Sequence, residues 1–482
     1  MKRSCSFVIP ESLYRRLNAH LFPGDDDEHG AVILAGYALV NGHSRLLARE
    51  LYIAQDGLDH VNGQYGYKMI RAEFIRPLIR RARLQKLVYI GIHNHGGSTS
   101  VSFSQDDLDS HERAHPALLD LAEGMPVGAA VFARDAAAGD IWFPDGTRLV
   151  LHETRILGAN IRSIYPRQPN DANAITGREY CRQVQMFGAA GQERLHQAKV
   201  AVVGAGGVGS LLVEYLARLG IGSLVVIDPE HIDISNLSRV VGASIKDVTG
   251  ETIRKSWRHW PILKALFHTR NEPSLKIDIA RNVAKQANAN ILYQGIAGDF
   301  AKNFVAKQVL DCDFLFLAAD SMSARLVFNA IVQQYYIPGI QIGSLIATDK
   351  AGGELERVFS VTRWSTPGIG CLWCSDSIDR YQLALEAKSD AQRAEQAYGT
   401  DISNPSVITV NAVGAASAAN DFLFSYLGLF SDEVVPAPRR TQHLDRRVTT
   451  EKLEPGPNCP ECSRDNDSRL GRGDMCELPT TQ

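Results

Sequence analysis

A glycine run, GAGGVG at residues 204–209, constrains the fold of this chain more than any other feature of its sequence. It follows the apolar run KVAVV, which predicts a buried strand, and precedes SLLVEYLARL, whose apolar spacing predicts a helix. Asp228 ends the next apolar run and is placed to accept hydrogen bonds from ribose hydroxyls. These features predict a doubly wound parallel sheet whose glycine loop closes on nucleotide phosphates at a helix N-terminus. The expected phosphate contacts are Gly204, Gly206, Gly207 and Gly209. Taken alone, this pattern fits NAD or FAD as well as ATP.

Length and composition place this sheet in a protein of two domains and a tail. A chain of 482 residues exceeds one ordinary core, and 45% hydrophobic with 22% charged residues is typical of soluble globular proteins. The net charge of −3 provides no basic field for nucleic acid. No apolar segment has the length of a signal-peptide core or of a membrane span. We therefore expect a cytoplasmic protein that binds neither nucleic acid nor a membrane.

Alternating patterns divide the chain further. Between residues about 30 and 150, strand-like runs such as KLVYIGIH alternate with helical stretches, which predicts a mixed sheet with flanking helices. A stretch rich in Pro, Asn and Gly then predicts a linker. We expect an α/β domain at residues 1–160, a linker at 161–177, the doubly wound α/β domain at 178–435 and a tail at 436–482. Residues 249–273 contain no second glycine motif and are interpreted as an insertion into the second domain.

A candidate metal site lies at the end of the run LVYIGIHNH. Side chains two residues apart on a strand point the same way, so His93 and His95 can converge on one ion. Downstream, Ser104 is a candidate helix N-cap, and Asp107 then falls in the first turn of that helix. Two histidines and one aspartate leave a fourth tetrahedral position open, which is typical of catalytic zinc.

This HxH, gap and SxxD pattern resembles the JAMM signature of JAB-domain (MPN-type) isopeptidases, which remove ubiquitin or process ubiquitin-like and sulfur-carrier proteins. The resemblance implies a catalytic zinc ion, with Glu28 ahead of HGAVILAG as the general base. It also implies that Ser104 helps to hold the oxyanion or the bound water. Gly96 stands where the family usually has proline, and the gap to the serine is one residue longer, which makes Asp106 a fallback ligand.

Four motifs around the glycine run distinguish ATP from a dinucleotide. REYCRQVQMFGAAGQERL, DISNLSR, LKIDIAR and LAADSMSARLVFNA resemble, in this order, the ThiF and MoeB family and the adenylation domains of ubiquitin-activating enzymes. The resemblance covers residues 178–435 and implies ATP and magnesium as cofactors. The reaction it implies is attack of a protein's terminal carboxylate on the α-phosphate, with pyrophosphate leaving.

The same resemblance assigns roles to individual residues. Asn236 and Arg239 would contact the triphosphate, and Lys276 would neutralise charge on the phosphates. Asp320 would hold magnesium. Arg182 matches an arginine that reaches into the nucleotide site of a partner subunit, which implies a homodimer.

Two CxxC pairs, far apart in the sequence, predict a structural metal site. In a reducing compartment such pairs favour metal over disulfides. Two such knuckles form a closed four-thiolate zinc site, which can stabilise a fold by about 10 kcal/mol. ThiF and MoeB relatives carry similar pairs at corresponding places. The expected zinc ligands are Cys371, Cys374, Cys459 and Cys462.

Ubiquitin-activating enzymes also use a free cysteine that receives the activated C-terminus as a thioester. The stretch ahead of NPSVITVNAVGAASAAN, where a relative would carry it, contains no cysteine. Cys181 and Cys312 lie in unsuitable contexts, and Cys476 in the tail is a weak candidate. Either the acyl adenylate goes directly to an acceptor, or a hydroxyl such as Thr400 or Ser403 replaces the thiol with the help of a base.

Three functions fit these features. The first is a bacterial-type ubiquitin-like conjugation protein that adenylates and also processes or deconjugates one glycine-ended modifier, with a conjugating enzyme as further partner. The second is activation and processing of a sulfur-carrier protein. The third is an adaptor without catalysis that binds a ubiquitin-like protein.

Overall fold

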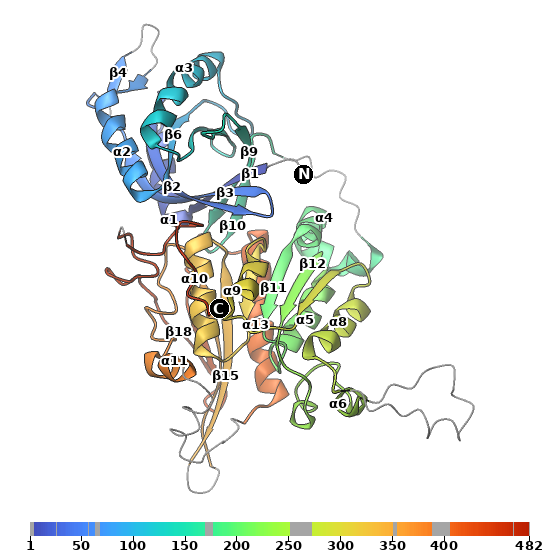
Figure 1. Cartoon of the computed structure of the whole chain (residues 1–482). Coiled ribbons are helices and arrows are strands. Elements are labelled where there is room, and N and C mark those ends of the chain that lie inside the picture. The colour runs from blue at the N-terminus through green and yellow to red at the C-terminus, as the bar shows by residue number, and fades with distance from the viewer. Residues whose placement is uncertain are drawn as a thin grey trace.

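The computed structural model describes residues 4–25, 27–55, 57–62, 68–168, 177–250, 272–349, 354–387, 405–465 and 467–481. Two eight-stranded sheets, one in each half of the chain, organise the described residues (Figure 1). The expected mixed α/β fold class is thereby confirmed. Most of the insertion at 249–273, and the candidate hydroxyls Thr400 and Ser403, lie outside the described residues.

The first sheet has the strand order β1-β3-β2-β6-β7-β8-β9-β10, and a further pairing of β1 with β9 closes it on itself. A small hairpin of β4 and β5 stands apart from it. The strands are β1 (Ser4–Pro10), β2 (Gly30–Val40), β3 (His43–Ile53), β4 (His60–Asn62), β5 (Lys68–Ile70), β6 (Val88–Asn94), β7 (Val127–Phe132), β8 (Ala137–Trp142), β9 (Arg148–Leu157) and β10 (Ile161–Ile164). The helices are α1 (Glu11–Leu21), α2 (Ala72–Gln85) and α3 (Gln105–Ala122).

The second sheet has the order β13-β12-β11-β14-β15-β16-β17-β18. Its first five strands run parallel, and β16 to β18 are added antiparallel. The strands are β11 (Lys199–Val203), β12 (Ser223–Ile227), β13 (Leu292–Ile296), β14 (Phe314–Leu317), β15 (Gly339–Thr348), β16 (Leu355–Ser365), β17 (Arg439–Gln442) and β18 (Arg447–Thr450).

Helices cover both faces of the second sheet. The α-helices are α4 (Cys181–Gln197), α5 (Gly209–Leu219), α6 (Ile245–Thr249), α8 (Lys276–Ala287), α9 (Asn303–Ala306), α10 (Met322–Tyr335), α11 (Arg380–Glu386) and α13 (Ile408–Leu427). Short 3-10 turns are η2 (Arg178–Tyr180), η3 (Ile234–Asn236) and η5 (Lys307–Val309). None of these described helices, nor those of the first half, is long and apolar enough to cross a membrane.

The apolar run of β11 explains this two-sided layering. Val200 and Val202 face one core with α5, α8 and α13, whereas Ala201 and Val203 face another with α9 and α10. Alternation along a strand sends neighbouring side chains to opposite faces, so a continuous apolar run requires cover on both sides. This is the reason that KVAVV becomes a central strand with the glycine loop at its carboxyl end.

The expected domain boundaries differ from the strand pairing at two places. β10 pairs with β9, so the first sheet extends to Ile164, beyond the boundary expected at residue 160. β17 and β18 pair with β16, so part of the expected tail from residue 436 belongs to the second sheet. None of these three short strands has an apolar pattern long enough to separate it from a loop.

The C-terminal segment, dark red in Figure 1, lies between the two halves. The Arg49 guanidinium of β3 donates to the carbonyl of Leu470, and Asp474 donates its backbone N–H to the carbonyl of Tyr37 at 2.8 Å. Arg155 of β9 also forms an ion pair with Asp313 at 2.9 Å. One hydrophobic core includes residues of both halves, so the two sheets pack as one body.

Candidate functional site

His93 and His95 lie where β6 ends. His93 is in register between Gly30 of β2 and Val131 of β7, and the backbone N–H of His95 donates to the carbonyl of Phe132 at 2.9 Å. The strand alternation expected from the sequence directs both rings to one side, and their Nε2 atoms lie 3.2 Å apart.

Asp107 meets these rings from the first turn of α3. Its Oδ1 lies 3.4 Å from Nε2 of His93, and its Oδ2 lies 3.3 Å from Nε2 of His95. Burial opposes ionisation of this carboxyl, but hydrogen bonds from His93, His95 and Ser104 outweigh it and hold its pKa below the ordinary range. In return, the hydrogen bond to Asp107 raises the pKa of His95.

Ser104 is the N-cap of α3, as its position in the sequence indicates. Its hydroxyl donates to Oδ2 of Asp107 at 2.7 Å and accepts from the Asp107 backbone N–H at 3.2 Å. The Ser104 backbone N–H donates to the same Oδ2 at 2.8 Å, which completes a capping box. In this arrangement the hydroxyl is committed to Asp107. The fallback ligand Asp106 is exposed and lies outside the cluster.

Glu28 approaches the same cluster from the loop before β2. Its Oε1 lies 3.7 Å from Nε2 of His95, and its side chain is 36% exposed. A carboxylate at this distance can exchange a proton with a water molecule beside the histidines.

The donor set of this cluster fits zinc. Bonds of about 2.0–2.1 Å in a tetrahedral site place neighbouring ligand atoms about 3.3–3.4 Å apart. The two Nε2 atoms are 3.2 Å apart, and each lies within 3.4 Å of one oxygen of Asp107, Oδ1 for His93 and Oδ2 for His95, so the carboxylate faces both nitrogens at separations close to that value. Three protein ligands leave one position for water or substrate.

The four cysteines of the two CxxC pairs also converge. Cys371 Sγ lies 3.8 Å from Cys374 Sγ and 3.8 Å from Cys459 Sγ, and Cys374 Sγ lies 3.4 Å from Cys462 Sγ. Zinc–sulfur bonds of about 2.3 Å imply tetrahedral edges of about 3.8 Å. The cluster is mostly buried, which suits a closed structural site.

The glycine run forms a tight loop at the carboxyl edge of the second sheet. Gly204 has φ of +92°, and a β-carbon on it would lie 2.8 Å from the backbone nitrogen of Ala319. A β-carbon on Gly207 would lie 2.6 Å from Nδ2 of Asn411 and 3.2 Å from Cδ of Arg239. Gly204 requires glycine for its conformation and its close approach to backbone, whereas a β-carbon on Gly207 would force the Asn411 side chain to move. The loop therefore lies among the end of β14, Arg239 and α13.

Asp228 is oriented from two sides at the end of β12. Its Oδ2 accepts from the backbone N–H of Ala205 at 2.7 Å, and its Oδ1 accepts from that of Glu230 at 2.9 Å. Burial raises its pKa. Lys276, the first residue of α8, forms an ion pair with Glu230 and contributes positive charge near Asp228.

Two of the other expected nucleotide contacts, Asn236 and Asp320, follow the strands that flank β11, whereas Arg182 lies on α4. Asn236 is buried at the end of η3, where its Oδ1 accepts from the backbone N–H of Asp233 at 3.3 Å. Asp320 is exposed and directly follows Ala319, which lies against Gly204. Arg182 is exposed on the first turn of α4.

Two residues of this region were missed in the sequence. Asn411 of α13 accepts from Ser344 Oγ at 2.7 Å and donates to Ser406 Oγ at 3.0 Å, and it lies directly against Gly207. Glu230, the ion-pair partner of Lys276, follows Asp228 closely. No short motif links position 411 to the glycine run, whereas Glu230 could have been noticed as a second acid after the strand.

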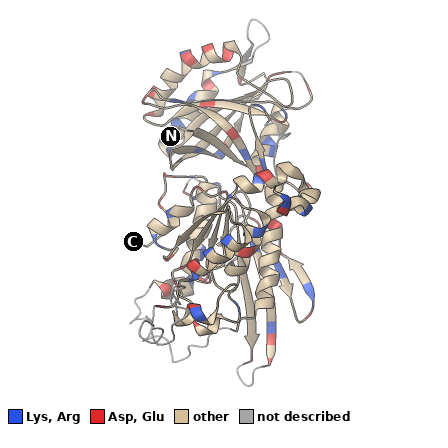
Figure 2. Ribbon diagram, turned by 90° about the vertical axis from the view of Figure 1, so that its right-hand side faces the viewer, with Lys and Arg blue, Asp and Glu red and all other residues tan. Residues whose placement is uncertain are grey.

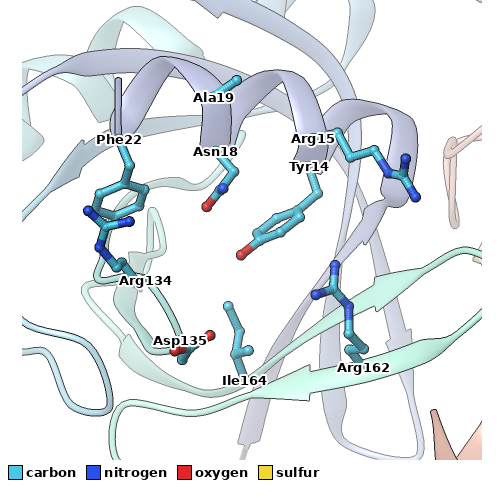
Figure 3. Close-up of a pocket in the computed structure, with 9 residues that line it drawn as sticks. All are labelled: Tyr14, Arg15, Asn18, Ala19, Phe22, Arg134, Asp135, Arg162 and Ile164. Carbon is cyan, nitrogen blue, oxygen red and sulfur yellow. The ribbon is translucent and has the colours of Figure 1, made fainter. Parts of the chain in front are cut away.

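A polar pocket of about 480 Å³ lies between α1 and β10 (Figure 3). Arg162 lies over the ring of Tyr14 at 5.5 Å, and Arg134 lies over the ring of Phe22 at 5.8 Å. The adjacent Asp135 donates its backbone N–H to the carbonyl of Ser98 at 2.8 Å, in the loop between His95 and Ser104. A residue that lines the pocket is therefore hydrogen-bonded to the loop that joins the histidines to α3.

The cysteines outside the cluster differ in accessibility. Cys312 is buried, and burial raises the pKa of its thiol. Cys181 is exposed, and Cys476 accepts from Arg469 Nη1 at 3.3 Å. Elsewhere, Figure 2 shows Lys and Arg interspersed with Asp and Glu over both halves of the described chain.

The sequence profile of the ThiF family matches residues 180–463. The sulfur carrier protein ThiS adenylyltransferase of Bacillus subtilis (strain 168) is 26% identical over 201 residues, 41% of this chain and 51% of that protein. The sulfur carrier protein adenylyltransferase of Thermus thermophilus is 44% identical over 146 residues, 30% of this chain and 50% of that protein. The crystal structure of E. coli MccB aligns with a TM-score of 0.46 and 19% identity, covering 61% of this chain and 75% of that chain. This chain spans about half the length of these two curated relatives.

Proposed function

Because this chain belongs to the ThiF family, we propose that its second domain uses ATP to adenylate the C-terminal glycine of a small sulfur-carrier or ubiquitin-like protein. The observation that carries the proposal is the glycine loop, with Arg239 and Asn411 against Gly207 and Asp228 fixed by two backbone N–H groups. The names of the curated relatives favour a sulfur carrier. Sulfur-carrier activation therefore takes precedence over ubiquitin-like conjugation, and a conjugating enzyme is not needed.

The residues around the loop have complementary roles in this reaction. The backbone N–H groups of the loop face the phosphates, and each Asp228 oxygen keeps a lone pair for a ribose hydroxyl. Arg239 and Lys276 supply positive charge where negative charge develops on the α-phosphate and the leaving pyrophosphate. Asp320 is an exposed carboxylate beside the loop, of the oxygen type that magnesium prefers.

Carrier-dependent exchange of labelled pyrophosphate into ATP tests this proposal. Arg239→Ala should lower the exchange rate by about 100-fold, as expected for loss of one charge contact to the transition state. Arg281→Ala, on the exposed face of α8, is the matched control and should leave the rate unchanged. Equal exchange rates in both variants would show that Arg239 does not contribute to the reaction.

A second proposal concerns the first domain, which we assign to JAMM-type peptidases of the JAB/MPN class. The convergence of His93, His95 and Asp107, whose imidazole nitrogens both face the carboxylate, supports it. A zinc ion there would acidify a coordinated water and polarise a carbonyl group. Glu28, beside His95, would take a proton from that water and deliver it to the leaving amine. The substrate would be a C-terminal extension on the carrier protein that the second domain activates.

Cleavage of a carrier protein with a short C-terminal extension tests the peptidase. Glu28→Gln and Asp107→Asn should each abolish cleavage, and Asp106→Asn, one residue away on the exposed surface, should not. Binding of the carrier without cleavage by the wild-type chain would support the adaptor function.

The fate of the adenylate follows from the cysteines. Cys312 is buried and its pKa is raised. Cys181 begins α4 beside Gln183, whose side chain donates to the carbonyl of Arg218, at the end of α5 opposite the glycine loop. Cys476, the weak candidate in the tail, accepts a hydrogen bond from Arg469. We therefore propose direct transfer of the activated carboxyl group to an acceptor. A covalent adduct between the chain and the carrier that thiol or hydroxylamine releases would overturn this step.

Arg182 on α4 is the proposed contact to a second subunit, so the active form would be a homodimer.

A further inference from the structure

A second cluster of metal-binding side chains lies deeper in the first domain. His111 and His115 project from α3, one turn apart, and Asp140 projects from β8. One ligand atom from each residue lies within 4.8 Å of those of the other two. The spacing of two histidines four residues apart on a helix allows both rings to reach one ion.

Each of the three side chains has a buried polar atom without a hydrogen-bond partner among the described residues. These atoms are Nδ1 of His111, Nδ1 of His115 and Oδ1 of Asp140. His115 is 4% exposed and Asp140 is 1% exposed. Burying a polar atom without a partner costs free energy, and three such atoms in one place indicate a missing common partner.

Packing alone does not account for these atoms. The rings of His111 and His115 are stacked with centroids 4.6 Å apart, and His115 packs edge-on against Trp142 at 5.3 Å. Those contacts use the ring faces and edges and leave the Nδ1 atoms of both histidines without a hydrogen-bond partner among the described residues. Asp140 forms an ion pair with Arg148 through Oδ2, which leaves Oδ1 available. A guanidinium on one carboxylate oxygen is a common way to orient the other toward a metal.

We propose that His111, His115 and Asp140 form a further metal site for a divalent transition-metal ion such as zinc. Two imidazoles and one carboxylate are the donor set that zinc and iron(II) prefer. The ion would fasten α3 to β8 and draw the ligand atoms together from their present spacing. This inference stands whether or not the first domain is a peptidase.

The site would also steady the candidate zinc cluster. Asp107, His111 and His115 follow one another at four-residue intervals, so they lie on one face of α3. The ring of Phe103 lies between the clusters, with centroids 6.2 Å from His93 and 4.7 Å from His111. An ion that fixes α3 below Asp107 would fix the position of Asp107 itself.

Zinc content of the full-length chain tests this site. The stripped protein is loaded with zinc, desalted and measured by elemental mass spectrometry. We expect three zinc ions per chain, from the four cysteines, the cluster at Asp107 and the cluster at Asp140. His115→Gln should remove one ion, whereas His152→Gln, at an exposed histidine of β9, should remove none. An unchanged zinc content in folded His115→Gln would overturn the proposal.

A second variant keeps the test decisive if His115→Gln does not fold. The double variant His95→Gln, Asp107→Asn disables the outer cluster, formed by His93, His95 and Asp107. It leaves the inner cluster of His111, His115 and Asp140 unchanged, so two zinc ions per chain should remain. A single remaining ion, held by the four cysteines, would overturn the inner site. Conversely, loss of zinc in His115→Gln without loss in the outer variant would support the inner site and contradict the proposed peptidase.

Discussion

The Nε2 atom of His95 lies 3.3 Å from Oδ2 of Asp107, although His95 directly follows β6 and Asp107 lies in α3. β6 positions the histidine, and the capping box with Ser104 positions the carboxylate at the start of α3. A short loop joins the two, so their geometry follows from one strand end and one helix start. The backbone of this strand end and helix start therefore places the ligand atoms of His95 and Asp107 close together.

Ser104→Ala tests whether this serine positions Asp107. Loss of the N-cap should cost about 1 kcal/mol of stability, because one backbone N–H of the first turn loses its acceptor. The affinity of the outer cluster for zinc should fall as Asp107 is released. Thermal unfolding and competition with a coloured zinc chelator measure the two effects. Ser110→Ala, further along α3, is the control, and equal zinc affinities in both variants would exclude the positioning role.

Removal of zinc from the four cysteines should release the C-terminal segment. Cys459 and Cys462 precede the residues that contact Arg49 and Tyr37 of the first domain. Cys374→Ser should therefore lower the melting temperature and expose residues 467–481 to proteases. Cys181→Ser, at an exposed cysteine outside the cluster, should change neither. Protease resistance of the segment in Cys374→Ser would show that zinc does not hold it.

Gly207→Ala should destabilise the chain even without nucleotide. The added β-carbon would lie 2.6 Å from Nδ2 of Asn411, whose side chain is held by Ser344 and Ser406. Overpacking of this kind costs about 1–3 kcal/mol. A β-carbon on Gly206 meets nothing within 4 Å, so Gly206→Ala is the control for unfolding in the absence of ATP. Equal melting temperatures would contradict the close approach of Asn411.

Acid should destabilise the first domain through His43. Burial, together with positive charge from Arg45, lowers the pKa of His43 to about 4, whereas an unfolded histidine titrates near its ordinary value of about 6.5. Between pH about 6.5 and about 4, His43 is protonated in the unfolded chain but not in the folded chain. The stability that neutral His43 contributes is therefore present above pH about 6.5 and is lost as the pH falls toward 4. Denaturant titrations at pH 7 and pH 5 measure the loss. His43→Gln should show a smaller loss, and an equal one would contradict the assignment.

Local patterns predicted much of this molecule. The glycine run, the HxH strand end, Ser104 with Asp107 and the two CxxC pairs each depend on short-range geometry that alternation and capping dictate. Long-range pairing was not predictable in the same way. Asn411 reaches Gly207 only because α13 packs on the sheet, and the closing of the first sheet by β1 and β9 has no local signal. The spacing of His111 and His115 was visible, but Asp140 lies on a separate strand.

Formation of an acyl adenylate on a glycine-ended carrier protein is the reaction that we propose for this chain. Intact-mass spectrometry of a carrier incubated with the chain, ATP and magnesium tests it most directly, with a carrier lacking its last glycine as control. We predict a carrier species heavier by one adenylyl group, absent from the truncated carrier and from reactions with Asp320→Ala. An unmodified carrier, across sulfur-carrier and ubiquitin-like candidates that bind the chain, would contradict the account.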